Sequence, residues 1–109
     1  MRAYLIILAL LPVLAAGPSC AADPPRFSLT IRNHQFEPAQ LEVPADTKIE
    51  LHIRNADPTP AEFESADMHR EKVVTGGQEI TVFIGPLRAG SYEFFDDFNP
   101  TARGHVVAR

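Results

Sequence analysis

Short runs that alternate apolar and polar residues are the feature of this sequence that most constrains its fold. In residues 48–54 (KIELHIR), every second side chain is apolar, so one face of an extended strand would be apolar and the other polar. Similar runs occur at residues 27–31, 40–43, 61–64, 72–74, 79–84, 91–95 and 105–108. No stretch of the chain after the N-terminal region keeps the helical period. The pattern predicts an all-β antiparallel sandwich with at most one helical turn, near residues 65–69.

The same alternation predicts which side chains fill the core of the sandwich. The apolar residues of two of these runs, 48–54 and 79–84, should face inward, and they should meet an aromatic and a valine from the last two runs. The side chains expected to be buried are Ile49, Leu51, Ile53, Ile80, Val82, Phe94 and Val106.

The chain opens with a pattern typical of a secretory signal peptide. A basic start is followed by an apolar run over residues 3–16 and then by small residues. The run is shorter than the roughly 20 apolar residues that a membrane span needs. We therefore expect residues 1–22 to be a cleaved signal peptide, residues 23–109 to be the mature domain, and the protein to be periplasmic. Lipidation of Cys20, which would tether the protein to the membrane, is an open alternative.

Charge and cysteine content exclude several classes of function. The formal net charge is −4 and there is no basic block, so we expect no binding to nucleic acid. Cys20 is the single cysteine, and its removal with the signal peptide would leave no disulfide and no thiolate ligand. No Ser-His-Asp or Cys-His arrangement that would indicate hydrolytic catalysis stands out.

Four phrases, in the same order along the chain, resemble the cupredoxin family. They are residues 36–43 (FEPAQLEV), residues 55–63 (NADPTPAEF), residues 71–77 (EKVVTGG), and residues 92–100 (YEFFDDFNP) followed by GHVV at 104–107. The resemblance covers nearly all of the mature domain. It implies a cupredoxin-like, antiparallel Greek-key β-sandwich.

In cupredoxins, these phrases also carry the copper ligands. The loop after the strand of the last phrase supplies Cys, His and Met, and the second phrase supplies another His. The matching positions here are Asp96, Asn99, approximately Ala102, and Ala61. Blue copper depends on a thiolate and imidazoles with a weak axial thioether. The sequence therefore keeps the cupredoxin frame but predicts no type 1 blue copper centre.

A narrower resemblance is to the small periplasmic cupredoxin-like proteins that accompany bacterial high-affinity ferrous iron permeases. It rests on residues 62–65 (EFES), 67–74 (DMHREKVV) and 95–98 (FDDF). It implies a protein that binds iron, and assists oxidation of Fe(II), for an inner-membrane iron permease and other periplasmic components of the same uptake system. Whether the role is enzymatic stays open, because the sequence supplies no electron acceptor.

Carboxylates gather in the same phrases. In a cupredoxin-like sandwich, the loops before Glu62 and after residue 95 meet, so we expect Glu62, Glu64, Asp96 and Asp97 to converge, with His69 above them. Carboxylates together with histidine suit non-haem iron, and an oxygen-rich site favours Fe(III). Asp96 is the leading candidate because it takes the position of the copper cysteine. Neighbours in a strand point to opposite faces, so it stays open whether Asp96 and Asp97 both reach one ion.

Two alternatives to an iron site stay open. In the first, the domain holds no metal and its acidic end docks a partner, with Glu62 and Glu64 forming the solvent face of a strand. In the second, Met68, His69 and carboxylates form a non-blue copper site. Copper is less favoured than iron, because copper carriers usually show several Met and His residues.

Overall fold

The computed structural model describes residues 2–12 and 23–109 of the chain. Residues 2–12 form no helix or strand. The expected end of the signal peptide at residue 22, and Cys20, lie outside the described residues, so the signal peptide stays a prediction. Within the two described segments, no helix has the length and apolar character needed to cross a membrane.

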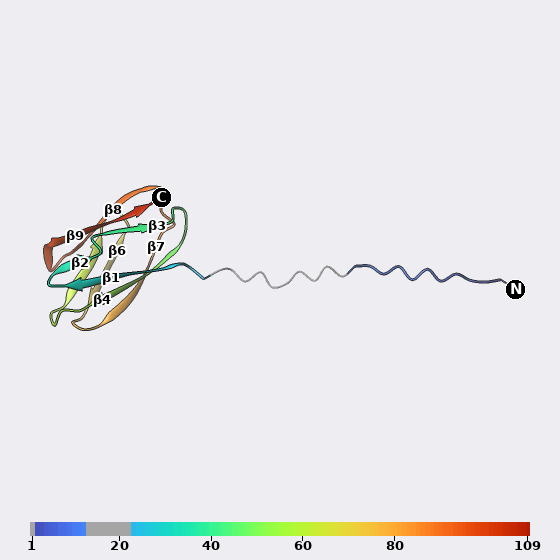
Figure 1. Cartoon of the computed structure of the whole chain (residues 1–109), viewed down its shortest axis with the longest axis horizontal. Coiled ribbons are helices and arrows are strands. Elements are labelled where there is room, and N and C mark those ends of the chain that lie inside the picture. The colour runs from blue at the N-terminus through green and yellow to red at the C-terminus, as the bar shows by residue number, and fades with distance from the viewer. Residues whose placement is uncertain (1, 13–22) are drawn as a thin grey trace.

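Residues 23–109 form two β-sheets that pack face to face (Figure 1). The strands are β1 (Arg26–Arg32), β2 (Gln35–Glu37), β3 (Gln40–Val43), β4 (Ile49–Asn55), β5 (Ala61–Ser65), β6 (Arg70–Val74), β7 (Glu79–Ile84), β8 (Gly90–Asp96) and β9 (Asn99–Ala108). One sheet has the order β2-β1-β4-β7, and the other has the order β3-β9-β8-β5-β6. The prediction of an all-β sandwich is confirmed, and residues 66–69 form a turn and not a helix.

Three details of the sheets differ from the expectation. The pairs β1–β4 and β3–β9 run parallel, so the sheets are mixed, although the other pairs are antiparallel as predicted. Strand β2 is too short for its alternation to show in the sequence. Strand β9 begins at Asn99, well before the predicted start at residue 105, and this difference bears directly on the candidate site.

The core contains the side chains that the alternation predicts. Ile49, Leu51 and Ile53 of β4 are fully buried, as are Phe94 and Val106. Val82 is also buried. Ile80 is only half buried, because it lies near the beginning of β7, an edge strand of its sheet.

Three phenylalanines link the two sheets beneath the ends of β5 and β8. The ring of Phe94 lies 4.8 Å from that of Phe36, edge to face, and 5.4 Å from that of Phe63. Phe63 and Phe94 are fully buried. Because side chains alternate along a strand, burial of Phe63 points its neighbours Glu62 and Glu64 to the outer face of the sheet.

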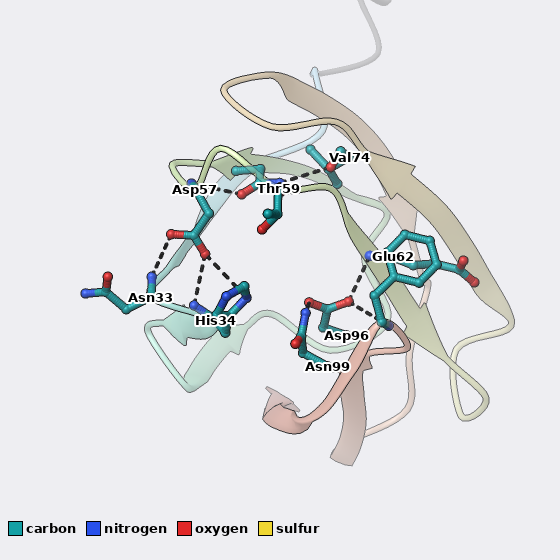
Figure 2. Close-up of polar contacts among 10 residues, drawn as sticks. Asn33, His34, Asp57, Thr59, Glu62, Val74, Asp96 and Asn99 are labelled. Atoms are coloured by element: carbon teal, nitrogen blue, oxygen red, sulfur yellow. Dashed lines mark hydrogen bonds and ion pairs between the residues drawn. The ribbon is translucent and has the colours of Figure 1, made fainter.

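Asp57, in the loop after β4, supports the turn that joins β1 to β2 (Figure 2). Its two carboxylate oxygens accept hydrogen bonds from the backbone amides of Asn33 and His34, at 2.8 and 2.9 Å. Both turn residues have positive φ angles, 53° and 55°. These hydrogen bonds lower the pKa of Asp57, the bond from the His34 amide most of all.

Asp57→Ala should therefore lower the free energy of unfolding by about 2 kcal/mol, since two amides lose a charged acceptor. A carboxyl pKa that is lower in the folded state than in the unfolded state stabilises the fold at pH values above the unfolded-state pKa. The difference in the free energy of unfolding between Asp57→Ala and the wild type should therefore shrink as the pH falls below about 3.8. Urea unfolding at pH 7 and at pH 3 measures both effects. The exposed Asp23→Ala is the matched control, and equal stability of Asp57→Ala and wild type at pH 7 would contradict the assignment.

Candidate metal centre

Asp96, the leading ligand candidate from the sequence, lies inside the sandwich and is fully buried. Its Oδ1 accepts hydrogen bonds from the backbone amides of Glu62 at 2.9 Å and Phe98 at 3.0 Å (Figure 2). Its Oδ2 lies 3.4 Å from the Nδ2 donor of Asn99. The side chain therefore ties β5 to the connection between β8 and β9.

The connection between β8 and β9 is a tight turn. Asp96 pairs with Asn99 across the two strands, which leaves only Asp97 and Phe98 between them. The bond from the Asp96 carboxylate to the amide two residues later is a turn-forming interaction typical of Asp and Asn. The copper-ligand loop expected from the resemblance is thus absent from residues 96–104, because the chain reverses at once and β9 begins.

The positions of the copper ligands in the resemblance do not fit a type 1 copper centre here. Ala61 and Ala102 are buried and offer only methyl groups. Asp96 faces N–H donors with both oxygens, and Asn99 provides an amide. These four residues supply neither the thiolate nor the imidazoles that define such a centre.

Adding Cu(II) to the protein should therefore give no intense thiolate-to-copper absorption in the visible range. The triple variant Ala61→His/Asp96→Cys/Asn99→His supplies the missing ligand types and should gain such a band if these positions converge. Optical titration of both proteins is the measurement. An intense visible band in the wild type would contradict the prediction.

Glu62, Glu64 and Asp97 lie on the outer face of the five-stranded sheet and form what we term the outer-face cluster. One carboxylate oxygen from each residue lies within 4.8 Å of the others. Glu62 and Glu64 flank the inward-facing Phe63, and the Asp97 amide donates to the Glu62 carbonyl oxygen at 3.0 Å. Figure 2 shows the Glu62 side chain pointing away from Asp96. Of the two adjacent aspartates, Asp97 belongs to the cluster and Asp96 does not.

Glu62 is the unusual member of the outer-face cluster. Its side chain is on the outer face, yet only 8% of the residue is exposed. Its Oε1 atom is buried and has no hydrogen-bond donor within the described part of the chain. Buried carboxylates are normally paired or hydrogen-bonded, so an unpaired oxygen indicates a missing partner.

Crowding of carboxyl groups opposes ionisation at this cluster. A hydrogen bond shared with the Glu71 carboxyl, followed by burial and the charges of Glu71, Asp97 and Glu64, raises the pKa of Glu62 to about 7. Burial, and then the charges of Asp97 and Glu71, also raise the pKa of Glu64. Raised pKa values of this kind are typical of buried carboxyl groups that are crowded together without a neutralising cation.

The turn between β5 and β6 does not contribute to the outer-face cluster. His69 is exposed at the end of that turn, with a positive φ of 55°, and is not among the grouped ligands. Met68 is buried in the core. The structure therefore brings together three of the five predicted ligands and places Asp96 and His69 elsewhere.

Glu71 lies beside this site, and the sequence analysis missed it. It lies on β6 directly opposite Glu64. The register follows from the short turn 66–69, since pairing of Ser65 with Arg70 places residues 64 and 71 opposite each other. Recognition of residues 61–74 as one hairpin would have revealed it.

Residues 4–108 match the cupredoxin-like domain family. The chain belongs to this family. A curated relative, an uncharacterized protein of Rickettsia prowazekii, is 49% identical over 80 residues, which cover 72% of this chain and 64% of the relative. The match therefore spans slightly less than two thirds of that relative's length.

Solved cupredoxin structures share the fold. A purple cupredoxin from Nitrosopumilus maritimus is 20% identical, with a TM-score of 0.60, over 75% of this chain and 98% of that chain. Auracyanin A, a blue copper protein from Chloroflexus aurantiacus, is 13% identical, with a TM-score of 0.68, over 80% and 100%. The metal-binding domain of a Cu(I)-exporting P-type ATPase from Streptococcus pneumoniae is 16% identical, with a TM-score of 0.66, over 77% and 84%. These identities support a common fold alone.

Proposed function

We propose that this cupredoxin-like protein is periplasmic and binds iron at the outer-face cluster on behalf of an inner-membrane iron uptake system. The observation that carries the proposal is the buried, unpartnered Oε1 atom of Glu62. Glu62 belongs to a group of three carboxylates, and one oxygen from each is close enough to the others to bind one ion. A cation there would neutralise the repulsion among these groups and would provide a partner for the Oε1 atom.

The ligand set favours a hard cation. Carboxylate oxygens suit hard ions, whereas soft copper(I) is selected by thiolate and thioether ligands. Among the biologically redox-active metals, iron accepts such oxygen ligands, and Fe(III), the harder of its two ions, is stabilised by them more than Fe(II) is. Oxidation of bound Fe(II) would pass one electron to dioxygen or to a partner protein. The assignment to an iron permease system rests on the resemblance of residues 62–65, 67–74 and 95–98 to its cupredoxin-like components.

Copper at a non-blue site has less support. The structural relatives named above include copper proteins, but they share only the fold with this chain. The thioether of Met68 packs in the core, on the side of the sheet opposite to the outer-face cluster. Met68 and the carboxylates therefore cannot bind one ion without rearrangement of the core.

Anaerobic addition of Fe(II), followed by oxygen, tests the iron assignment. The wild type should bind Fe(II), and oxygen uptake should be faster with the protein than with free Fe(II) or with Glu62→Gln. Parallel titrations with Cu(II) and with redox-inert Zn(II) compare the metals. Binding of Cu(II) but not Fe(II) at the cluster would contradict the assignment, and unchanged oxygen uptake would limit the protein to iron binding.

The second candidate function is a metal-free docking module. It is favoured by two exposed apolar residues beside the cluster, Val73 opposite Glu62 and Phe98 after Asp97. Val73 is 46% exposed and Phe98 is 49% exposed. If no cation binds, this acidic and apolar surface should be tested as a protein contact, with Phe98→Ser as the disrupting variant.

Export is tested by mass spectrometry of the protein recovered from cells. The proposal predicts a mature chain beginning at residue 22 or 23. An intact Met1 would contradict cleavage, whereas an acylated Cys20 would make the protein a membrane-tethered lipoprotein.

A further inference from the structure

Glu71 faces the same side of the sheet as the outer-face cluster. It pairs directly with Glu64 in the antiparallel hairpin of β5 and β6. Residues directly opposite in such a pair carry their side chains on one face, with Cβ atoms about 5 Å apart. The exposed Glu71 carboxyl is not among the three whose oxygens already lie together, but it is the neighbour that raises the pKa of Glu62 most.

This group of four carboxylates has no ion-pair partner among the described residues. None of the ion pairs among the described residues includes Glu62, Glu64, Glu71 or Asp97. Arg70, the nearest arginine in sequence, donates from Nε to the Phe83 carbonyl at 2.7 Å. Lys72 pairs with Phe63 and so lies on the other face of the hairpin.

Like charges placed directly opposite in a β-hairpin destabilise it, so Glu64 and Glu71 are an unfavourable pair without a cation. The buried Oε1 atom of Glu62 beside them has no hydrogen-bond donor among the described residues, so a proton or a cation would stabilise the arrangement. Four carboxylates contribute four negative charges at full ionisation. A divalent ion leaves two of these charges uncompensated, whereas a trivalent ion leaves only one.

We propose that Glu71 is the fourth ligand of the outer-face cluster and that its charge makes the site prefer a trivalent hard cation to a divalent one of similar size. This inference rests on the proposed function, because it extends the same site. Attraction between a ligand charge and an ion grows in proportion to the ion's charge. Removal of the Glu71 charge should therefore weaken binding of a trivalent ion more than binding of a divalent ion.

Tb(III) and Ca(II), two hard ions of similar size, are the probes. Glu71→Gln should lower the affinity for Tb(III) by about 30-fold or more, and the affinity for Ca(II) by a smaller factor. Luminescence lifetimes of bound Tb(III) in H2O and D2O should show more coordinated water in Glu71→Gln than in wild type. Glu42→Gln, which removes a charge from the distant strand β3, should change neither property.

The outcomes separate this inference from the proposed function. If Glu62→Gln/Glu64→Gln/Asp97→Asn loses Tb(III) while Glu71→Gln binds it with wild-type affinity and hydration, Glu71 is not a ligand and the cation site stands. An equal loss of Tb(III) and Ca(II) affinity in Glu71→Gln would overturn the preference for trivalent ions. Absence of Tb(III) binding to the wild type would overturn both the inference and the cation site.

Discussion

Replacing Asp96 with alanine should lower the free energy of unfolding by about 3 kcal/mol or more. The substitution leaves the amides of Glu62 and Phe98 without the acceptor that they share, and each buried, unpaired amide costs about 1–3 kcal/mol. Asp96→Asn keeps an oxygen at the Oδ1 position, so its cost should be about 1 kcal/mol. Urea unfolding followed by circular dichroism measures the difference.

The same pair of variants separates support of the turn from metal ligation. Because Asp96 faces inward while Glu62, Glu64 and Asp97 face outward, Asp96→Asn should bind cations as the wild type does. A folded Asp96→Asn protein that binds no cation would show that Asp96 is a ligand, as its position in the sequence first indicated.

Glu62→Gln should make the cation-free protein more stable than wild type at pH 8. In the wild type, the pKa of Glu62 rises from 4.5 to about 7 on folding, chiefly through its hydrogen bond with Glu71. A raised carboxyl pKa means that the folded state keeps its proton longer, so wild-type stability falls as the pH increases between about 4.5 and 7. Glu62→Gln has no carboxyl group at this position, so it does not lose stability in this way as the pH rises.

The gain in stability of Glu62→Gln over the wild type should be small near pH 4.5 and reach its full size above pH 7. Urea unfolding in the presence of a chelator measures this gain. A cation should reverse the order. At a concentration 100 times its dissociation constant, it should stabilise the wild type by about 2.7 kcal/mol and leave the variant nearly unchanged. An exposed, solvated Glu62 would instead give equal stability at every pH, and that result would contradict the burial assigned to it.

The sequence predicts the frame of the site better than the direction of its side chains. Alternation in residues 48–54 places Ile49, Leu51 and Ile53 in the core, because a half-buried strand must turn its apolar residues inward. The cupredoxin phrases place the ends of β5 and β8 side by side. Alternation also explains why the side chains of Asp96 and Asp97 point to opposite faces of the sheet, although the sequence does not show which of the two faces inward.

The remaining features depend on tertiary contacts that no local pattern reveals. The link from Asp96 to the Glu62 amide of another strand, at 2.9 Å, is one such contact, whereas its hydrogen bond from the Phe98 amide is local to the turn. The start of β9 at Asn99 follows from that turn. Glu71 lies beside the site because of the register of a hairpin, and the burial of Glu62 depends on how the turn at residues 97–98 lies against β5.

Anaerobic calorimetric titration with Fe(II) tests the central claim, that a cation binds on the outer face and not at the vacated copper position. The three proteins are the wild type, Glu62→Gln/Glu64→Gln/Asp97→Asn, and the control Asp23→Asn/Glu37→Gln/Glu42→Gln, which removes the same number of charges elsewhere. We predict saturable one-to-one binding to the wild type and the control, and none to the cluster variant. Binding that is equal in all three proteins, or absent from the wild type, would contradict the account.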